Sequence, residues 1–222
     1  MDFMKLFKSL EELLYEVIVM LVFFPKTLWL TLRYPQRMMD YSDTELGDVL
    51  SNQYNDTLSP PLFLMLCVTL SYLADRAVPG ALDLSAVPAF LRDSQNLLAL
   101  RVLVFSLLPL AFSLRLLAGL GHRLDRETLR APFFAQCFVA APVAMIAGLA
   151  QALGHIPIAN ADMFASLLLG LTAVWYLRQQ ACWFHIKLAL PMWRCWAATI
   201  VMTFAASIVF VIIALAILVV GQ

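Results

Sequence analysis

The chain has 222 residues, of which 62% are hydrophobic and only 14% are charged, and its mean hydropathy is +0.83. Soluble globular domains are about 45–50% apolar and about 25% charged, so the composition excludes an ordinary soluble domain and a disordered chain. Fifteen basic residues balance fifteen acidic ones, which argues against the basic surface of a nucleic-acid-binding protein. The sequence therefore predicts an all-α polytopic membrane protein with no nucleic-acid partner.

The N-terminal part, residues 1–39, begins with an amphipathic pattern. Polar side chains recur every three or four positions and share one helix face: Lys5, Lys8, Ser9, Glu12 and Glu16. The uninterrupted apolar stretch 17–24 is shorter than the roughly 20 residues of a membrane span, and Pro25 with Lys26 is expected to end the helix. We expect this helix to lie in the membrane interface. The alternative is a first span, which would bury several glutamates at high cost.

Residues 40–57 form a polar, acidic segment. Its carboxylates are Asp40, Asp43, Glu45, Asp48 and Asp56. Ser42 and Glu45 fit a capping box that begins a short helix over residues 43–53. We interpret the first four carboxylates as a cytoplasmic docking surface for a protein partner, and the alternative is a solvated face with no partner. Their spacing is not that of a calcium-binding loop, so no metal or cofactor is predicted.

Residues 58–222 contain five apolar runs and predict a five-helix transmembrane domain. The runs cover residues 58–73, 97–117, 132–153, 163–177 and 197–220, and each approaches the length of a span with its flanks. With this division, twelve of the fifteen Lys and Arg residues fall on the side of the N-terminus. Basic loops stay in the cytoplasm, so we expect a cytoplasmic N-terminus and an external C-terminus.

All five tryptophans fall at the expected cytoplasmic interface: Trp29, Trp175, Trp183, Trp193 and Trp196. Tryptophan is enriched where a membrane meets water. Together with the neighbouring basic residues, these side chains predict a surface that contacts anionic lipid headgroups. The alternative is ordinary anchoring of the bundle by amphipathic rings.

A few polar residues lie in or beside the spans. Gln136 and Gln151 occur in the third run, and His155 and Asp162 precede the fourth. These four predict a polar path with an outward-facing mouth, although a hydrated loop and a helix cap would account for the last two equally well. Arg101 lies one turn inside the second run, and we expect it to pair with Asp75 or Asp93 or to extend to the interface.

Small residues recur at every fourth position of the third run. They are Ala140, Ala144, Gly148 and Ala152. A stripe of small residues lets a second helix approach closely, so we predict a helix-packing face here.

One stretch resembles a known family. Phe24-Pro25-Lys26-Thr27-Leu28-Trp29, followed by Arg33-Tyr34-Pro35, a polar interval and five apolar runs, is similar to bacterial Yip1-domain membrane proteins. The resemblance implies an all-helical five-span protein of the bacterial inner membrane and supplies no catalytic residues.

The sequence contains no G-x-S-x-G, P-loop or G-x-G-x-x-G motif, so enzymatic activity is not expected. We predict an integral membrane scaffold or accessory protein that docks a partner through its cytoplasmic face. The alternatives are a small permease or channel for a neutral or amphipathic solute, and a lipid-handling protein. The expected partners are membrane lipids together with another protein or further copies of this chain.

Overall fold

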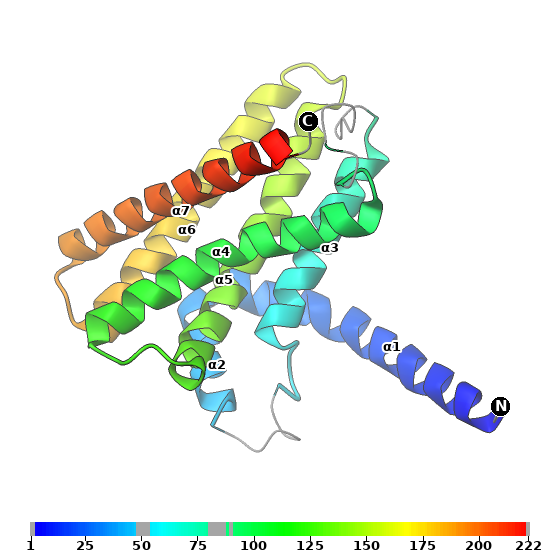
Figure 1. Cartoon of the computed structure of the whole chain (residues 1–222), viewed down its shortest axis with the longest axis horizontal. Coiled ribbons are helices and arrows are strands. Elements are labelled where there is room, and N and C mark those ends of the chain that lie inside the picture. The colour runs from blue at the N-terminus through cyan, green and yellow to red at the C-terminus, as the bar shows by residue number, and fades with distance from the viewer. Residues whose placement is uncertain (1–2, 48–53, 80–87, 89–90, 221–222) are drawn as a thin grey trace.

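The structure is a computed structural model that describes residues 3–47, 54–79, 88 and 91–220. Over these residues the helices of the chain are joined by turns and loops and no strand is present, which confirms the predicted all-α class (Figure 1). The helices are α1 (Phe3–Arg33), α2 (Pro35–Glu45), α3 (Pro60–Ala77), α4 (Ser94–Leu120), α5 (Arg126–Gly154), α6 (Ala161–Leu188) and α7 (Met192–Val220).

Helix α5 is the centre of the bundle, and two apolar cores lie on its two sides. One core joins α5 to α3 and includes the rings of Phe63 and Phe138, whose centroids are 6.1 Å apart. The other joins α5 to α4 and α6, where Phe112 lies 5.6 Å from the ring of Tyr176. Helices α4 and α7 run side by side across one face of the bundle (Figure 1).

Four of the described helices are long and apolar enough to cross a membrane: Phe7–Arg33 within α1, Ser94–Leu120, Arg126–Gly154, and Met192–Ile217 within α7. This set is compatible with an integral membrane protein. It differs from the five predicted spans, because it includes the N-terminal helix and omits α3 and α6. Helix α3 is long enough at 18 residues, but its two prolines, Asp75 and Arg76 lower its mean hydropathy, and α6 carries several polar and charged residues in its second half.

The predicted helix end at Pro25 is wrong, because α1 continues through this proline to Arg33. A proline inside a helix removes one backbone hydrogen bond, but the turns that follow are held by the rest of the protein. Thr27 is fully buried, and its Oγ1 donates to the Phe23 carbonyl at 2.8 Å and accepts the Leu58 N–H at 3.1 Å. The earlier part of α1 projects away from the bundle, and every side chain from residue 7 to residue 18 is exposed (Figure 1).

The predicted helix over 43–53 is also wrong in its start. Helix α2 begins at Pro35, and proline suits the first turn of a helix because its missing N–H would have no partner there. Ser42 is therefore buried in the helix and does not cap it. Instead, the Glu45 carboxylate accepts the backbone N–H of Tyr54 at 2.6 Å, and the Tyr54 hydroxyl lies 3.3 Å from Ser42 Oγ. These contacts attach the chain at residue 54 to α2.

Candidate functional site

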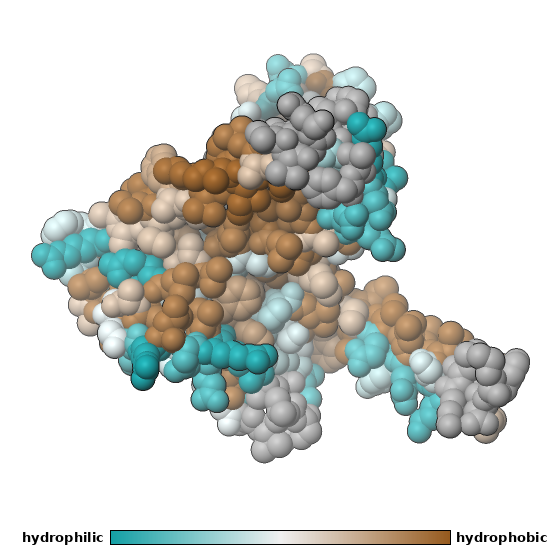
Figure 2. Space-filling view, viewed as in Figure 1, coloured by the Kyte–Doolittle hydropathy of each residue, from teal (hydrophilic) through white to brown (hydrophobic). Residues whose placement is uncertain are grey.

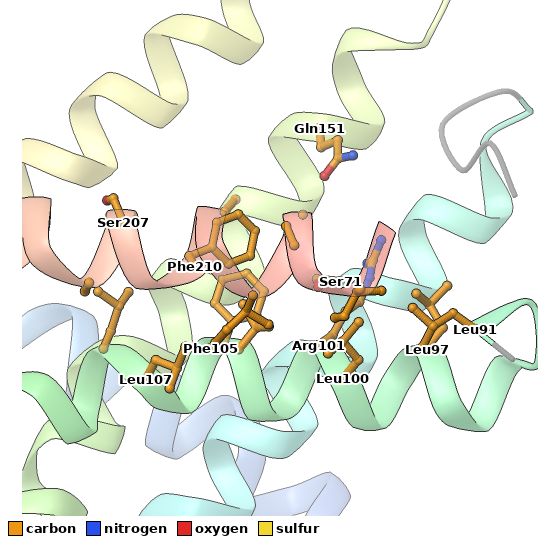
Figure 3. Close-up of a pocket in the computed structure, with 18 of the residues that line it drawn as sticks. Ser71, Leu91, Leu97, Leu100, Arg101, Phe105, Leu107, Gln151, Ser207 and Phe210 are labelled. Carbon is orange, nitrogen blue, oxygen red and sulfur yellow. The ribbon is translucent and has the colours of Figure 1, made fainter. Parts of the chain in front are cut away.

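A cavity of about 590 Å³ lies between α3, α4, α5 and α7. Its volume is in the range of ligand pockets, roughly 300–1,000 Å³. The cavity lies near the C-terminal ends of α3, α5 and α7 and the N-terminal half of α4, so it occupies one end of the bundle (Figure 3).

The walls of this cavity are mostly apolar because two helices present regular apolar faces to it. On α4, Leu97, Val104 and Leu108 are separated by seven and four positions and share one face. On α7, Phe210 and Ile217 are seven positions apart and face the same space. Figure 3 shows the α4 and α7 side chains meeting in the region between the two helices.

Arg101 is the charged residue of the cavity wall. It stands on the same face of α4 as Leu97 and Leu108, and its Nη1 donates to Asp75 Oδ2 at 2.5 Å. The Asp75 side chain is fully buried, and that of Arg101 is 19% exposed. Of the two expected partners the structure selects Asp75, while Asp93 caps α4 by accepting the N–H of Gln95 at 3.3 Å.

A second guanidinium lies close to this ion pair. Arg101 and Arg76 are 5.3 and 5.8 Å from the centroid of the Tyr72 ring. Arg76 also donates to the Tyr72 hydroxyl at 3.0 Å and to Ser94 Oγ at 2.6 Å. The cavity end therefore has two guanidinium groups around one aromatic ring, with one buried carboxylate.

The inner wall is formed where α3 and α5 approach most closely. A Cβ added to Gly148 would lie only 2.3 Å from Ser71 Cβ, so only glycine fits this contact. The other members of the predicted packing stripe, Ala140, Ala144 and Ala152, are buried as well. Ala140 and Ala144 belong to the α3–α5 core.

A second cavity, of about 620 Å³, adjoins the first, and Ala147 and Gln151 line both. His155 and Asp162 also line it. The structure thus gathers three of the four residues of the predicted polar path. At this mouth His155 Nδ1 is 2.9 Å from the Gln151 carbonyl, and Asn160 is the N-cap residue of α6 without a side-chain capping bond.

Gln136 is not part of this group, and its assignment to the path is wrong. Fifteen residues of helix separate it from Gln151, which is about 22 Å along the axis. It is fully buried between α5 and α6, where its Oε1 accepts the amide of Gln180 at 2.6 Å. Gln136 is therefore a structural contact between two helices.

The five tryptophans have different surroundings. Trp29 and Trp193 are 67% and 68% exposed, and Trp175 and Trp196 are half-buried against the α4–α5–α6 core. Trp183 is fully buried, and Lys187 Nζ lies 4.4 Å from its ring centroid. Its assignment to the lipid interface is wrong, because it shares the inward face of α6 with Tyr176 and Gln180.

The acidic segment makes contacts within the chain. Asp40 and Asp43 pair with Lys187 of α6 at 3.0 and 2.9 Å. Burial lowers the pKa of Lys187, but the hydrogen bonds and charges of Asp43 and Asp40 raise it by more, so the pKa is above its ordinary value. Glu45 is bonded to Tyr54 as described, and Asp48 lies outside the described residues.

Within the described ranges, no group of three or more His, Cys, Asp and Glu side chains is arranged to hold a metal ion. Comparison with protein-family models, with curated proteins and with solved structures gives no match for this chain. The resemblance to Yip1-domain proteins therefore stays a prediction, and the cavity is the feature that indicates a function.

Proposed function

We propose that this chain is an integral membrane protein that binds an amphipathic molecule in the cavity between α3, α4, α5 and α7. The observation that carries the proposal is the lining of that cavity, which is apolar along α4 and α7 and includes Arg101 as its charged residue. Ligand pockets of this kind combine apolar walls with a few polar groups that fix orientation. A long apolar chain with a polar head matches both parts.

The proposed membrane arrangement keeps α3 to α7 as spans and α1 at the surface. Although α3 is short, its 18 residues extend about 27 Å, close to the roughly 30 Å of a bilayer core. The N-terminal ends of α3, α5 and α7 then face the cytoplasm with most of the basic residues, and the cavity lies toward the outer side. The bacterial inner membrane is suggested by the family resemblance alone.

The ligand is proposed to enter sideways from the membrane, between α4 and α7. The outer faces of both helices are exposed and apolar, as shown by Leu103 on α4 and Phe204 and Ile208 on α7. Figure 2 shows hydrophobic residues gathered over this face, with hydrophilic residues toward the ends of the molecule. A membrane lipid would already surround these helices and need not cross water to reach the cavity.

A second candidate function is transfer of the bound molecule to the outer surface. The observation that favours it is the shared wall of the two cavities, where Gln151 lines both. This candidate corresponds to the predicted permease for an amphipathic solute. Docking of a protein partner is less well supported, because Asp40, Asp43 and Glu45 already have partners within the chain.

Native mass spectrometry of the protein, purified gently and then mixed with a single-chain neutral lipid such as oleyl alcohol, tests binding. Ala214→Phe places a ring in the cavity. The ring takes up the space of the lipid's apolar chain, so the bound fraction should fall at least roughly tenfold. Leu215→Phe, on the neighbouring exposed position, is the matched control and should bind as the wild type does. Equal binding by both variants, with both folded, would exclude this cavity as the site.

A further inference from the structure

The polar end of the cavity indicates which head group the ligand carries. We infer that the cavity binds an anionic amphiphile, with a carboxylate or phosphate head held by Arg101 and a single apolar chain between α4 and α7. This inference rests on the proposed function and assigns the chemical class of its ligand.

Arg101 has donors left for a ligand although it pairs with Asp75. A guanidinium has five N–H donors in a planar fork, and the bond to Asp75 involves Nη1. The Asp75 side chain is fully buried, whereas the Arg101 side chain is 19% exposed and Arg101 is among the residues that line the cavity. Asp75 therefore fixes the orientation of the guanidinium and leaves part of its fork for an anion, for which arginine geometry is well suited.

The hydroxyl groups in the lining do not compete with Arg101 as donors. Ser71 Oγ donates to the Val68 carbonyl at 3.0 Å, and Ser207 Oγ donates to the Thr203 carbonyl at 2.9 Å. Their single protons are used on their own helices, so both present lone pairs to the cavity. Arg101 and the amide of Gln151 are then the side chains of this lining that offer N–H groups to an anion.

The guanidinium of Arg101 favours an anion over a neutral head. Arg101 and Arg76 bring two positive charges within 6 Å of the Tyr72 ring centre, and Asp75 supplies one negative charge. Arg76 is exposed and lies outside the lining, so water screens its charge and it contributes little at the cavity. The buried Asp75 balances Arg101, and an anionic head gains chiefly from charge-assisted hydrogen bonds to the N–H groups of Arg101 that Asp75 leaves free. A neutral head gains no comparable interaction.

The apolar chain of the ligand is inferred from the other residues of the lining. Beyond Arg101 the lining residues are apolar, with Val104 and Leu108 on α4 and Ile213 and Phe210 on α7. Figure 3 shows Phe210 of α7 close to Phe105 of α4. These side chains give a single aliphatic or isoprenoid chain a continuous apolar wall on two sides of the cavity.

The test compares oleic acid, oleyl phosphate and oleyl alcohol by native mass spectrometry of the full-length protein in detergent. The three probes share one chain and differ in the head, so chain binding and head recognition are measured separately. The wild type should bind the better of the two anions at least roughly tenfold more tightly than the alcohol. The stronger anion shows whether the head is a carboxylate or a phosphate.

Variants of the ion pair decide whether Arg101 carries this preference. Arg101→Gln alone leaves Asp75 buried without its partner and can impair folding, so the double variant Arg101→Gln/Asp75→Asn is used beside it. It should bind the alcohol as the wild type does and lose most of the preference for the anion. The control Arg76→Gln, outside the cavity wall, should keep most of that preference.

The outcomes separate this inference from the proposed function. Equal wild-type binding of the acid, the phosphate and the alcohol would overturn the anionic head while amphiphile binding stands. An anion preference that survives in the folded double variant would also overturn the role of Arg101. Failure of all three probes to bind would reject the proposed function itself.

Discussion

At the scale of single residues, the contact of Gly148 with Ser71 sets the distance between α3 and α5. A methyl group at position 148 would lie 2.3 Å from Ser71 Cβ and 3.2 Å from its Cα. Gly148→Ala should therefore push the two helices apart and lower the free energy of unfolding by about 1–3 kcal/mol. Ser71→Gly in the same chain removes the closest clash and should restore much of the loss, as measured by thermal unfolding in detergent.

Gly170 provides a matched control for this prediction. It lies on α6, and a Cβ there would meet nothing within 4 Å. Gly170→Ala should leave stability unchanged or raise it slightly, because alanine favours a helix more than glycine does. If Gly170→Ala lowered the free energy of unfolding as much as Gly148→Ala, the loss at position 148 could not be attributed to the contact with Ser71.

The pair Gln136–Gln180 gives a second prediction at this scale. Both side chains are buried, and one hydrogen bond of 2.6 Å joins them. Gln180→Leu leaves the buried Gln136 Oε1 without its donor, which should lower the free energy of unfolding by about 1–3 kcal/mol. Gln136→Leu/Gln180→Leu removes both polar groups and should be more stable than either single variant by thermal unfolding. A double variant that simply adds the two losses would argue against a shared bond.

At the scale of the elements, α2 is attached to α6 by Lys187 and to the chain at residue 54 by Tyr54, and both groups depend on pH. Protonated Lys187 is favoured in the folded protein because Asp43 and Asp40 raise its pKa, so its stabilisation is present below about pH 10.4 and is lost as the pH rises through the raised pKa. Burial raises the pKa of Tyr54 to about 12, so the neutral phenol is likewise favoured and its contribution falls between about pH 10 and 12.

We therefore expect the unfolding temperature to fall between pH 10 and 12 as both groups lose their protons. Lys187→Arg keeps a positive charge at that pH, and Tyr54→Phe has no proton to lose. The double variant should lose less stability than the wild type over the same interval. Lys8→Arg, on the exposed part of α1, is the control and should follow the wild-type curve.

The elements also show where sequence patterns were sufficient and where they were not. Helical periodicity predicted a helix for the N-terminal stretch, and the proline at position 25 was expected to end it. The helix instead continues to Arg33, because packing of the buried Thr27 and Thr31 stabilises the turns after the proline. The capping pattern at Ser42 is a local signal. In the structure Ser42 lies inside α2, and its hydroxyl contacts the Tyr54 hydroxyl and does not cap a helix.

At the scale of the whole molecule, the number of spans can be tested directly. Single cysteines are introduced by Lys8→Cys, His122→Cys or His155→Cys in a Cys182→Ser background, since the other three native cysteines are buried. With α1 at the surface, a membrane-impermeant maleimide added to intact cells should label only the variant at position 155. If α1 crosses the membrane, the variant at position 8 should be labelled together with it.

The candidate site was predictable only in part. The sequence named Asp75 as one of two partners for Arg101, and it grouped Gln151, His155 and Asp162 near one mouth. It gave no signal for the cavity, because its lining comes from four helices separated by long stretches of chain. It also grouped Gln136 and Trp183 with exposed residues, since hydropathy does not tell which face of a helix meets a neighbour.

The sequence by itself determined the helical class, the apolar character and the positions of most helices, because hydropathy and periodicity are properties of neighbouring residues. Only the tertiary structure decided which side chains meet. It paired Lys187 with Asp40 and Asp43, buried Trp183, and brought α4 and α7 together around Arg101. The physical reason is that these contacts depend on how whole helix faces pack, and packing joins residues that local patterns treat separately.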